Sequence, residues 1–151
     1  MIDGSKMARI LATFFCVGYC PLAPGSAASF VGVLICYGLK DHTALSIAFG
    51  ALVIFLGFWS AGRMEKMAGK KDPSCVVIDE VAGMMMALFM LPFNWPVIVS
   101  AFFLFRAFDM FKIYPSNKLE ALPGAAGIML DDIVAGIYTN IIMQAAVRLV
   151  K

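Results

Sequence analysis

Three long stretches without a charged residue limit how this chain can fold. They cover residues 10–39, 43–62 and 81–105. The second is as long as the apolar helix of about 20 residues that crosses a lipid bilayer. Charged residues make up 15% of the chain, against about a quarter in soluble globular proteins, and the mean hydropathy is +0.87. The sequence therefore predicts an integral membrane protein.

Proline and glycine positions divide the chain into helical segments. Residues 8–20 are apolar but too short to span a bilayer, and Pro21, Pro24 and Gly25 follow them. Because these residues break helices, we expect an interfacial or re-entrant N-terminal segment. The expected membrane crossings lie at residues 25–39, 43–62, 75–91, 97–113 and 127–147. The predicted fold is all-α, a single domain over residues 1–151 that forms an integral membrane bundle of about four to five transmembrane helices.

The distribution of basic residues predicts the orientation of this bundle. The segment 63–74 carries four basic residues, whereas the turn at 92–96 carries none. By the positive-inside rule, segment 63–74 lies in the cytoplasm, together with the N-terminus and the loop at 114–126. The net charge of +2 and the absence of a basic cluster interleaved with aromatics argue against a nucleic-acid partner.

With that orientation, the polar residues of the apolar segments gather at one membrane face. Each lies in the first or last turns of an expected crossing on the cytoplasmic side, and Ser26 is expected to be the N-cap of the first. The set is Ser26, Asp79, Glu80, Arg106, Asp109, Lys112, Asp131 and Asp132. Such clustering at one depth is typical of a functional site.

Adjacent acids in an apolar segment need a counter-charge. Asp131 and Asp132 are the only charged residues between Gly127 and Val147, and unpaired carboxylates near hydrocarbon are costly. Hard divalent cations prefer carboxylate oxygen, and Mg²⁺ keeps water and substrate phosphate among its ligands. We therefore expect a Mg²⁺ site formed by Asp79, Glu80, Asp131 and Asp132.

Two further features support a site between packed helices. Arg106 and Lys112 are suited to binding a phosphate, because the guanidinium fork of arginine pairs with phosphate oxygens. Each acid pair is also followed by V-A-G. The glycines of these motifs, Gly83 and Gly136, predict a close approach between two helices.

Simpler interpretations of these residues stay open at this point. Each acid pair could stabilise the N-terminus of its own helix, where the helix dipole favours negative charge. Arg106 and Asp109 could form an isolated i, i+3 ion pair, and Lys112 could extend to the lipid headgroups. A membrane cation or proton transporter would also carry clustered intramembrane carboxylates, although nearer the bilayer midplane.

Four motifs make the chain resemble a known enzyme family. They are P-L-A-P-G-S (21–26), I-D-E-V-A-G (78–83), F-R-A-F-D-M-F-K-I-Y-P (105–115) and G-I-M-L-D-D-I-V-A-G (127–136). Together they resemble phosphatidylglycerophosphatase A, a magnesium-dependent bacterial membrane phosphatase, over about residues 10–147. The first motif departs from the family's usual P-G-T-x-G-S, with serine at position 26 and alanine at position 28.

The resemblance implies dephosphorylation of phosphatidylglycerophosphate to phosphatidylglycerol in the bacterial cytoplasmic (inner) membrane, with the active site on the cytoplasmic face. The substrate would be a phospholipid and the cofactor Mg²⁺. We expect Asp79, Asp109, Asp132 and Arg106 to be catalytic, with Asp109 or Asp132 as the base. We expect Arg106, Lys112 and Ser26 to bind the substrate.

Overall fold

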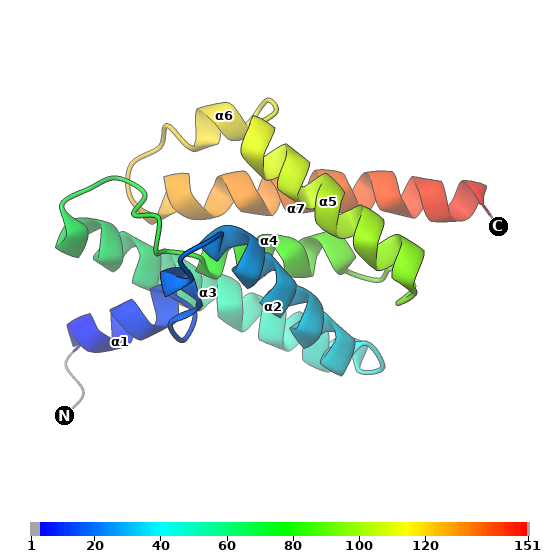
Figure 1. Ribbon diagram of the computed structural model, residues 1–151, viewed down its shortest axis with the longest axis horizontal. Helices are drawn as coiled ribbons and strands as arrows, with labels where there is room; N and C mark the ends of the chain where they lie inside the picture. Colours follow the sequence, from blue (N-terminus) through cyan, green and yellow to red (C-terminus); the bar gives the residue numbers. More distant parts are fainter. Residues whose placement is uncertain (1–3, 151) are drawn as a thin grey trace.

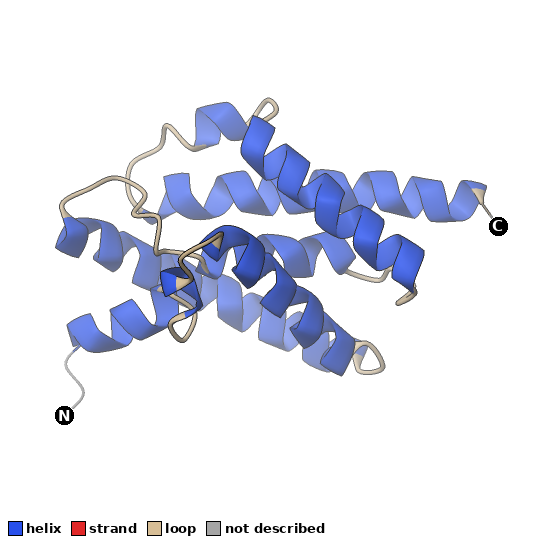
Figure 2. Cartoon of the chain, viewed as in Figure 1, coloured by secondary structure: helices blue, strands red, loops and turns tan. Residues whose placement is uncertain are grey.

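The computed structural model describes residues 4–150, and every regular element in this range is helical (Figure 2). The elements are α1 (Gly4–Ala12), the 3-10 helix η1 (Val17–Tyr19), α2 (Pro24–Leu39), α3 (Thr43–Ala68), α4 (Ile78–Leu88), α5 (Trp95–Phe111), α6 (Ser116–Leu119) and α7 (Ala125–Leu149). The all-α prediction is therefore confirmed. Two described helices, α3 and α7, are long and apolar enough to cross a membrane, so the expected number of four to five crossings stays a prediction.

Helix α4 forms the centre of the bundle (Figure 1). It packs against α2, α3, α5 and α7, and nine of its eleven residues are buried. The expected helix at 75–91 was too long: α4 rises about 16 Å, roughly half of a hydrocarbon core of about 30 Å. Val77 precedes it in a non-helical conformation, and Phe89 ends it in an extended one.

Two other expected boundaries were wrong. Helix α3 continues through Arg63 to Ala68 and ends at Gly69, whose φ of 61° is the left-handed conformation common just beyond helix ends. Ser26 is not an N-cap, because α2 already begins at Pro24. Proline suits the first helical turn, where its missing N–H is not needed. Ser26 therefore lies within the first turn of α2.

Close contact between α4 and α7 depends on two glycines. A Cβ atom on Gly83 would lie 2.7 Å from the carbonyl oxygen of Asp132, and one on Gly136 would lie 2.3 Å from that of Gly83. Both distances are too short for a side chain, so the predicted close approach at these glycines is confirmed. It brings the first turn of α4 beside the acid pair of α7.

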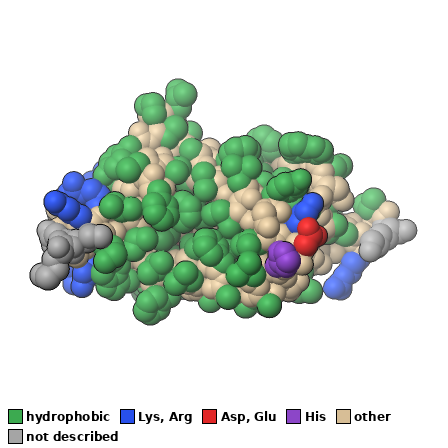
Figure 3. Space-filling view, turned by 90° about the horizontal axis from the view of Figure 1, so that it is seen from below, with side chains coloured by type: hydrophobic (Ala, Val, Ile, Leu, Met, Phe, Trp, Pro, Cys, Tyr) green, Lys and Arg blue, Asp and Glu red, His purple; other side chains and the backbone are tan. Residues whose placement is uncertain are grey.

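The outer surface is apolar between two polar ends. In Figure 3, hydrophobic side chains cover the middle of the visible face, while charged side chains and the single histidine lie towards its two ends. Exposed aromatic and aliphatic side chains on several helices include Phe30, Phe55, Phe103 and Ile141. A surface of this kind is what a lipid environment would cover.

Candidate functional site

Four helices contribute to one polar pocket at the end of the bundle where α2 and α4 begin and α5 ends. The pocket has a volume of about 290 Å³. All eight residues singled out in the sequence line it: Ser26, Asp79, Glu80, Arg106, Asp109, Lys112, Asp131 and Asp132. The tertiary structure thus brings together groups that are more than a hundred positions apart in the chain, such as Ser26 and Asp132.

Three carboxylates in this pocket are arranged as metal ligands could be. Asp79, Glu80 and Asp132 each offer an oxygen, and these atoms lie within 4.8 Å of one another. Asp79 and Asp132 are buried, with 7% and 3% of their surface exposed. Asp79 Oδ1, Glu80 Oε2 and Asp132 Oδ2 are buried and have no hydrogen-bond partner. Since buried polar atoms normally have partners, these oxygens fit a hard divalent cation.

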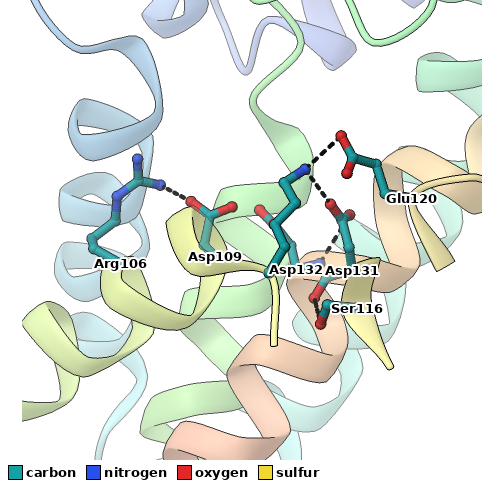
Figure 4. A network of polar contacts seen from close by, with 7 residues as sticks. Arg106, Asp109, Ser116, Glu120, Asp131 and Asp132 are labelled. Atoms are coloured by element: carbon teal, nitrogen blue, oxygen red, sulfur yellow. Dashed lines mark hydrogen bonds and ion pairs between the residues drawn. The ribbon is translucent and has the colours of Figure 1, made fainter. Parts of the chain in front are cut away.

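Asp131 is in the same pocket but has other partners. Lys112 Nζ donates to Asp131 Oδ2 at 3.0 Å, and the backbone N–H of Asp132 donates to Asp131 Oδ1 at 3.0 Å. Figure 4 shows the Asp131 carboxylate in this network. The structure therefore does not group Asp131 with the three acids that each have one buried oxygen without a partner.

Lys112 links three parts of the chain at the edge of the pocket. It follows the last residue of α5 with a left-handed φ of 46°. Its Nζ contacts Glu120 Oε1 at 2.8 Å as well as Asp131 on α7. Burial alone would lower the pKa of Lys112, but the hydrogen bonds to Glu120 and Asp131 outweigh it and raise the pKa above its ordinary value. Lys112 therefore carries a positive charge throughout the physiological pH range.

Arg106 and Asp109 form an ion pair on the last turns of α5 (Figure 4). The i, i+3 pairing that the sequence left open is therefore present. The pair does not use the whole guanidinium, because Arg106 Nε is buried without a partner. Gly25 of α2 packs against this group: a Cβ atom there would lie 3.1 Å from both terminal nitrogens and 2.5 Å from Glu80 Oε1. Glycine at this position lets α2 approach the arginine closely.

The sequence pattern did not reveal two residues that line the pocket and two that contact its lining residues. Asp72 and Ser74, from the loop between α3 and α4, line it. Ser116 donates from its hydroxyl to the backbone oxygen of Asp131 at 3.3 Å, and Glu120 pairs with Lys112. Asp72 and Ser74 lie in a loop, while Ser116 begins the short helix α6 and Glu120 follows its last residue. No pattern distinguished them from ordinary loop residues.

The charges of the pocket are unbalanced. Six carboxylates line it, together with two cationic side chains. Both cationic side chains are already paired with carboxylates, Arg106 with Asp109 and Lys112 with Asp131. The remaining acids repel one another at short range, so protons or a bound cation must compensate them. The pocket is therefore suited to a metal ion and, beside Arg106, to the phosphate that such an ion would coordinate.

Comparisons with known proteins agree with this chemistry. Residues 10–147 match the family described as phosphatidylglycerophosphatase A. A protein of Bacteroides thetaiotaomicron, provisionally named a phosphatidylinositol-3-phosphatase, is 39% identical over 147 residues, which cover 91% of each chain. Phosphatidylglycerophosphatase A of Haemophilus influenzae is 34% identical over 91% of this chain and 86% of its own length. Phosphatidylglycerophosphatase A of Escherichia coli is 34% identical over 87% of this chain and 78% of its own length. No solved structure matches the chain.

The helical fold, the acidic pocket and these relatives define the class of the protein: it is a lipid phosphatase. Within that class, the chain belongs to the phosphatidylglycerophosphatase A family.

Proposed function

We propose that this protein is a magnesium-dependent membrane phosphatase that converts phosphatidylglycerophosphate to phosphatidylglycerol in bacterial glycerophospholipid synthesis. The observation that carries the proposal is the cluster of Asp79, Glu80 and Asp132, whose unpartnered oxygens lie beside Arg106 in a pocket of a family member. The proposed substrate follows from the names of the two relatives called phosphatidylglycerophosphatase A.

The chain's own residues have distinct tasks in this proposal. Asp79, Glu80 and Asp132 hold Mg²⁺, and Asp131 maintains Lys112 at the edge of the pocket. Bound Mg²⁺ would polarise the phosphoryl group and stabilise charge on the leaving oxygen. Arg106 and Lys112 orient the phosphate through charge-assisted hydrogen bonds, and Ser26 adds a hydroxyl from the first turn of α2.

A carboxylate is the proposed base. His42, the only histidine, lies between α2 and α3, at the end of α2 opposite the pocket. Asp109 or Asp132 therefore takes the proton from the attacking water. In the other version of the mechanism, a carboxylate attacks phosphorus directly and water then releases the phosphate. Both versions leave the alcohol of the lipid headgroup as the second product.

The proposed environment is a multi-pass arrangement in the cytoplasmic membrane, with the pocket at the cytoplasmic surface. Two apolar helices of sufficient length, α3 and α7, support membrane insertion. The transporter interpretation loses its support, because the family consists of enzymes and the acids lie near helix ends.

One assay tests the reaction and the metal together. The complete protein, purified in detergent, receives phosphatidylglycerophosphate with Mg²⁺ or with a chelator in excess, and released phosphate is measured. We expect release only with Mg²⁺. Equal phosphate release in both samples would exclude the metal mechanism. No release in the presence of Mg²⁺ would exclude phosphatidylglycerophosphate as the substrate.

Phosphatidylinositol 3-phosphate is the second candidate substrate, because the relative that is 39% identical carries that activity in its provisional name. The same assay with this lipid compares the two headgroups. A larger kcat/KM for phosphatidylglycerophosphate supports the proposal. A larger value for the inositol lipid would assign the protein to the other reaction.

A further inference from the structure

A second, apolar cavity lies between α2 and α5. It is a groove of about 620 Å³, and apart from Asn94 its lining is aromatic or aliphatic. The two helices touch only over a limited part of their length, so the groove stays open along their sides. None of the residues that line it also lines the acidic pocket.

On α2, the groove continues the side of the helix that faces the pocket. Phe30, Val33, Leu34 and Tyr37 line the groove, and their spacing places them on one face of a helix. Ser26, which lines the acidic pocket, precedes Phe30 by four residues and lies on that same face. The polar and apolar cavities are thus successive sections of one helix surface.

On α5, the groove and the pocket also share one side of the helix, but here the groove residues come before the pocket residues in the sequence. Ile98, Val99, Phe102 and Phe103 line the groove, and Arg106 follows Phe102 by four residues and Phe103 by three. Residues at these spacings are neighbours on a helix surface. Since α2 begins at the pocket and α5 ends there, both helices lead from charged residues into the groove. Figure 1 shows the two helices running away from that end of the bundle.

The length of the groove suits a lipid chain. Trp95, at the start of α5, lines its far end, and Arg106 lies eleven positions after Trp95. Eleven residues of α-helix rise about 16 Å. One leaflet of a hydrocarbon core of about 30 Å is about 15 Å deep. A chain attached to a headgroup at Arg106 therefore extends along the groove to about the depth of one leaflet.

We propose that the groove between α2 and α5 holds an acyl chain of the phospholipid whose phosphorylated headgroup enters the acidic pocket. The proposal rests on the proposed function, which supplies a lipid phosphate as substrate, and assigns the path between α2 and α5 to its hydrocarbon part. The occupant has a charged end at Ser26 and Arg106 and an apolar end along Val33 and Val99. A diacyl phospholipid has both.

The first test fills the groove without changing the pocket. Val99 is 42% exposed on α5, and Ile142 is 45% exposed on α7, away from the groove. Val99→Trp and the control Ile142→Trp are assayed with a long-chain substrate and with a dibutyryl analogue of the same headgroup. We expect Val99→Trp to raise KM for the long-chain substrate about tenfold, the scale of an overpacked apolar site. We expect KM for the dibutyryl analogue, and both KM values of Ile142→Trp, to stay unchanged. Equal effects of the two variants, or equal effects on both substrates, would overturn the proposal.

The second test does not depend on turnover. Wild-type protein in nanodiscs is irradiated with phosphatidylglycerol that carries a diazirine in one acyl chain, and labelled peptides are identified by mass spectrometry. We expect labelling concentrated on α2 and α5 and reduced in Val99→Trp. Labelling spread equally over exposed residues such as Phe55 of α3 would overturn the proposal.

The two tests separate this proposal from the proposed function. If wild-type protein releases no phosphate from either substrate while the photolabel still maps to α2 and α5, the assigned reaction is wrong and the groove is a lipid site. If phosphate is released but neither the KM effect nor the labelling pattern appears, the reaction stands and the groove assignment is wrong.

Discussion

Three oxygen atoms without partners dominate the chemistry of the pocket. Asp79 Oδ1, Glu80 Oε2 and Asp132 Oδ2 are shielded from solvent by the surrounding side chains. Leaving charged groups buried and unpaired destabilises a fold by several kcal/mol. The same oxygens gain a strong interaction once a cation binds, because coordination replaces the lost hydration. The site is therefore expected to couple metal binding to stability.

Asp132→Asn tests this coupling at the level of one residue. The amide keeps the shape of the side chain but removes one negative charge from the cluster. We expect phosphatase activity to fall roughly a hundredfold or more, since even residues behind the metal ligands contribute up to that factor. We also expect Mg²⁺ to raise the melting temperature of the wild type, because a ligand that binds only the folded state stabilises that state. The melting temperature of Asp132→Asn should change little when Mg²⁺ is added.

Asp41→Asn is the matched control for that measurement. Asp41 is exposed and lies between α2 and α3, at the end of α2 away from the pocket. The control should keep both its activity and its response to Mg²⁺. An unchanged Mg²⁺ response in Asp132→Asn would show that Asp132 does not hold the ion.

At the level of the elements, the contact between α4 and α7 positions the acids of both helices. Gly83 and Gly136 lie one turn beyond the acid pairs, and a Cβ atom at either position would meet backbone atoms of the opposite helix. Backbone cannot move aside as a flexible side chain can. The distance between the two acid pairs is therefore tied to these two glycines.

Gly136→Ala should separate the two helices and lower both stability and activity. The added methyl group would meet the Gly83 carbonyl oxygen at 2.3 Å, and overpacking of this kind typically costs about 1–3 kcal/mol. Gly50, by contrast, lies within α3. In Gly50→Ala the new Cβ would lie 3.7 Å from the nearest atom, which belongs to the Met85 side chain. That control should be neutral or gain up to about 1 kcal/mol, because alanine favours helix over glycine. Denaturant unfolding in detergent measures the free energy of unfolding of both variants. Equal values for Gly136→Ala and Gly50→Ala would contradict the packing argument.

At the level of the whole molecule, the polar pocket and the α2–α3 connection lie at opposite ends of α2. Hydrophobic side chains cover the face between the two charged ends in Figure 3. If that band lies in the bilayer, the two ends face different compartments. The basic segment around Lys70 is then cytoplasmic and the turn at Asp41 faces the other side.

Single cysteines at these two ends test the orientation. Asp41→Cys and Lys70→Cys are made in a chain whose four native cysteines are replaced, and intact cells are treated with a membrane-impermeant maleimide. We expect labelling of Asp41→Cys in intact cells, and of Lys70→Cys only after the membrane is opened. Labelling of both from the same side would contradict a multi-pass arrangement in which the pocket faces the cytoplasm.

Much of this arrangement could be predicted from the sequence, for a physical reason. Charges in apolar segments are costly, so their positions are informative, and all seven charged residues singled out in this way line one pocket together with Ser26. Helix lengths were less predictable. The apolar stretch around Met84–Met86 is the same whether lipid or protein surrounds it, and only the packing of α2, α3, α5 and α7 around α4 shows that protein does.

The sequence alone determined the helical class, the apolar surface and the types of charged residue available, because these depend on composition and local spacing. Only the tertiary structure decided how the charges are divided. It pairs Asp131 with Lys112 and brings Glu120 to the same lysine, while one buried oxygen each of Asp79, Glu80 and Asp132 is left without a hydrogen-bond partner. Pairing of this kind depends on which side chains meet when separate helices pack. No local pattern in the chain encodes it.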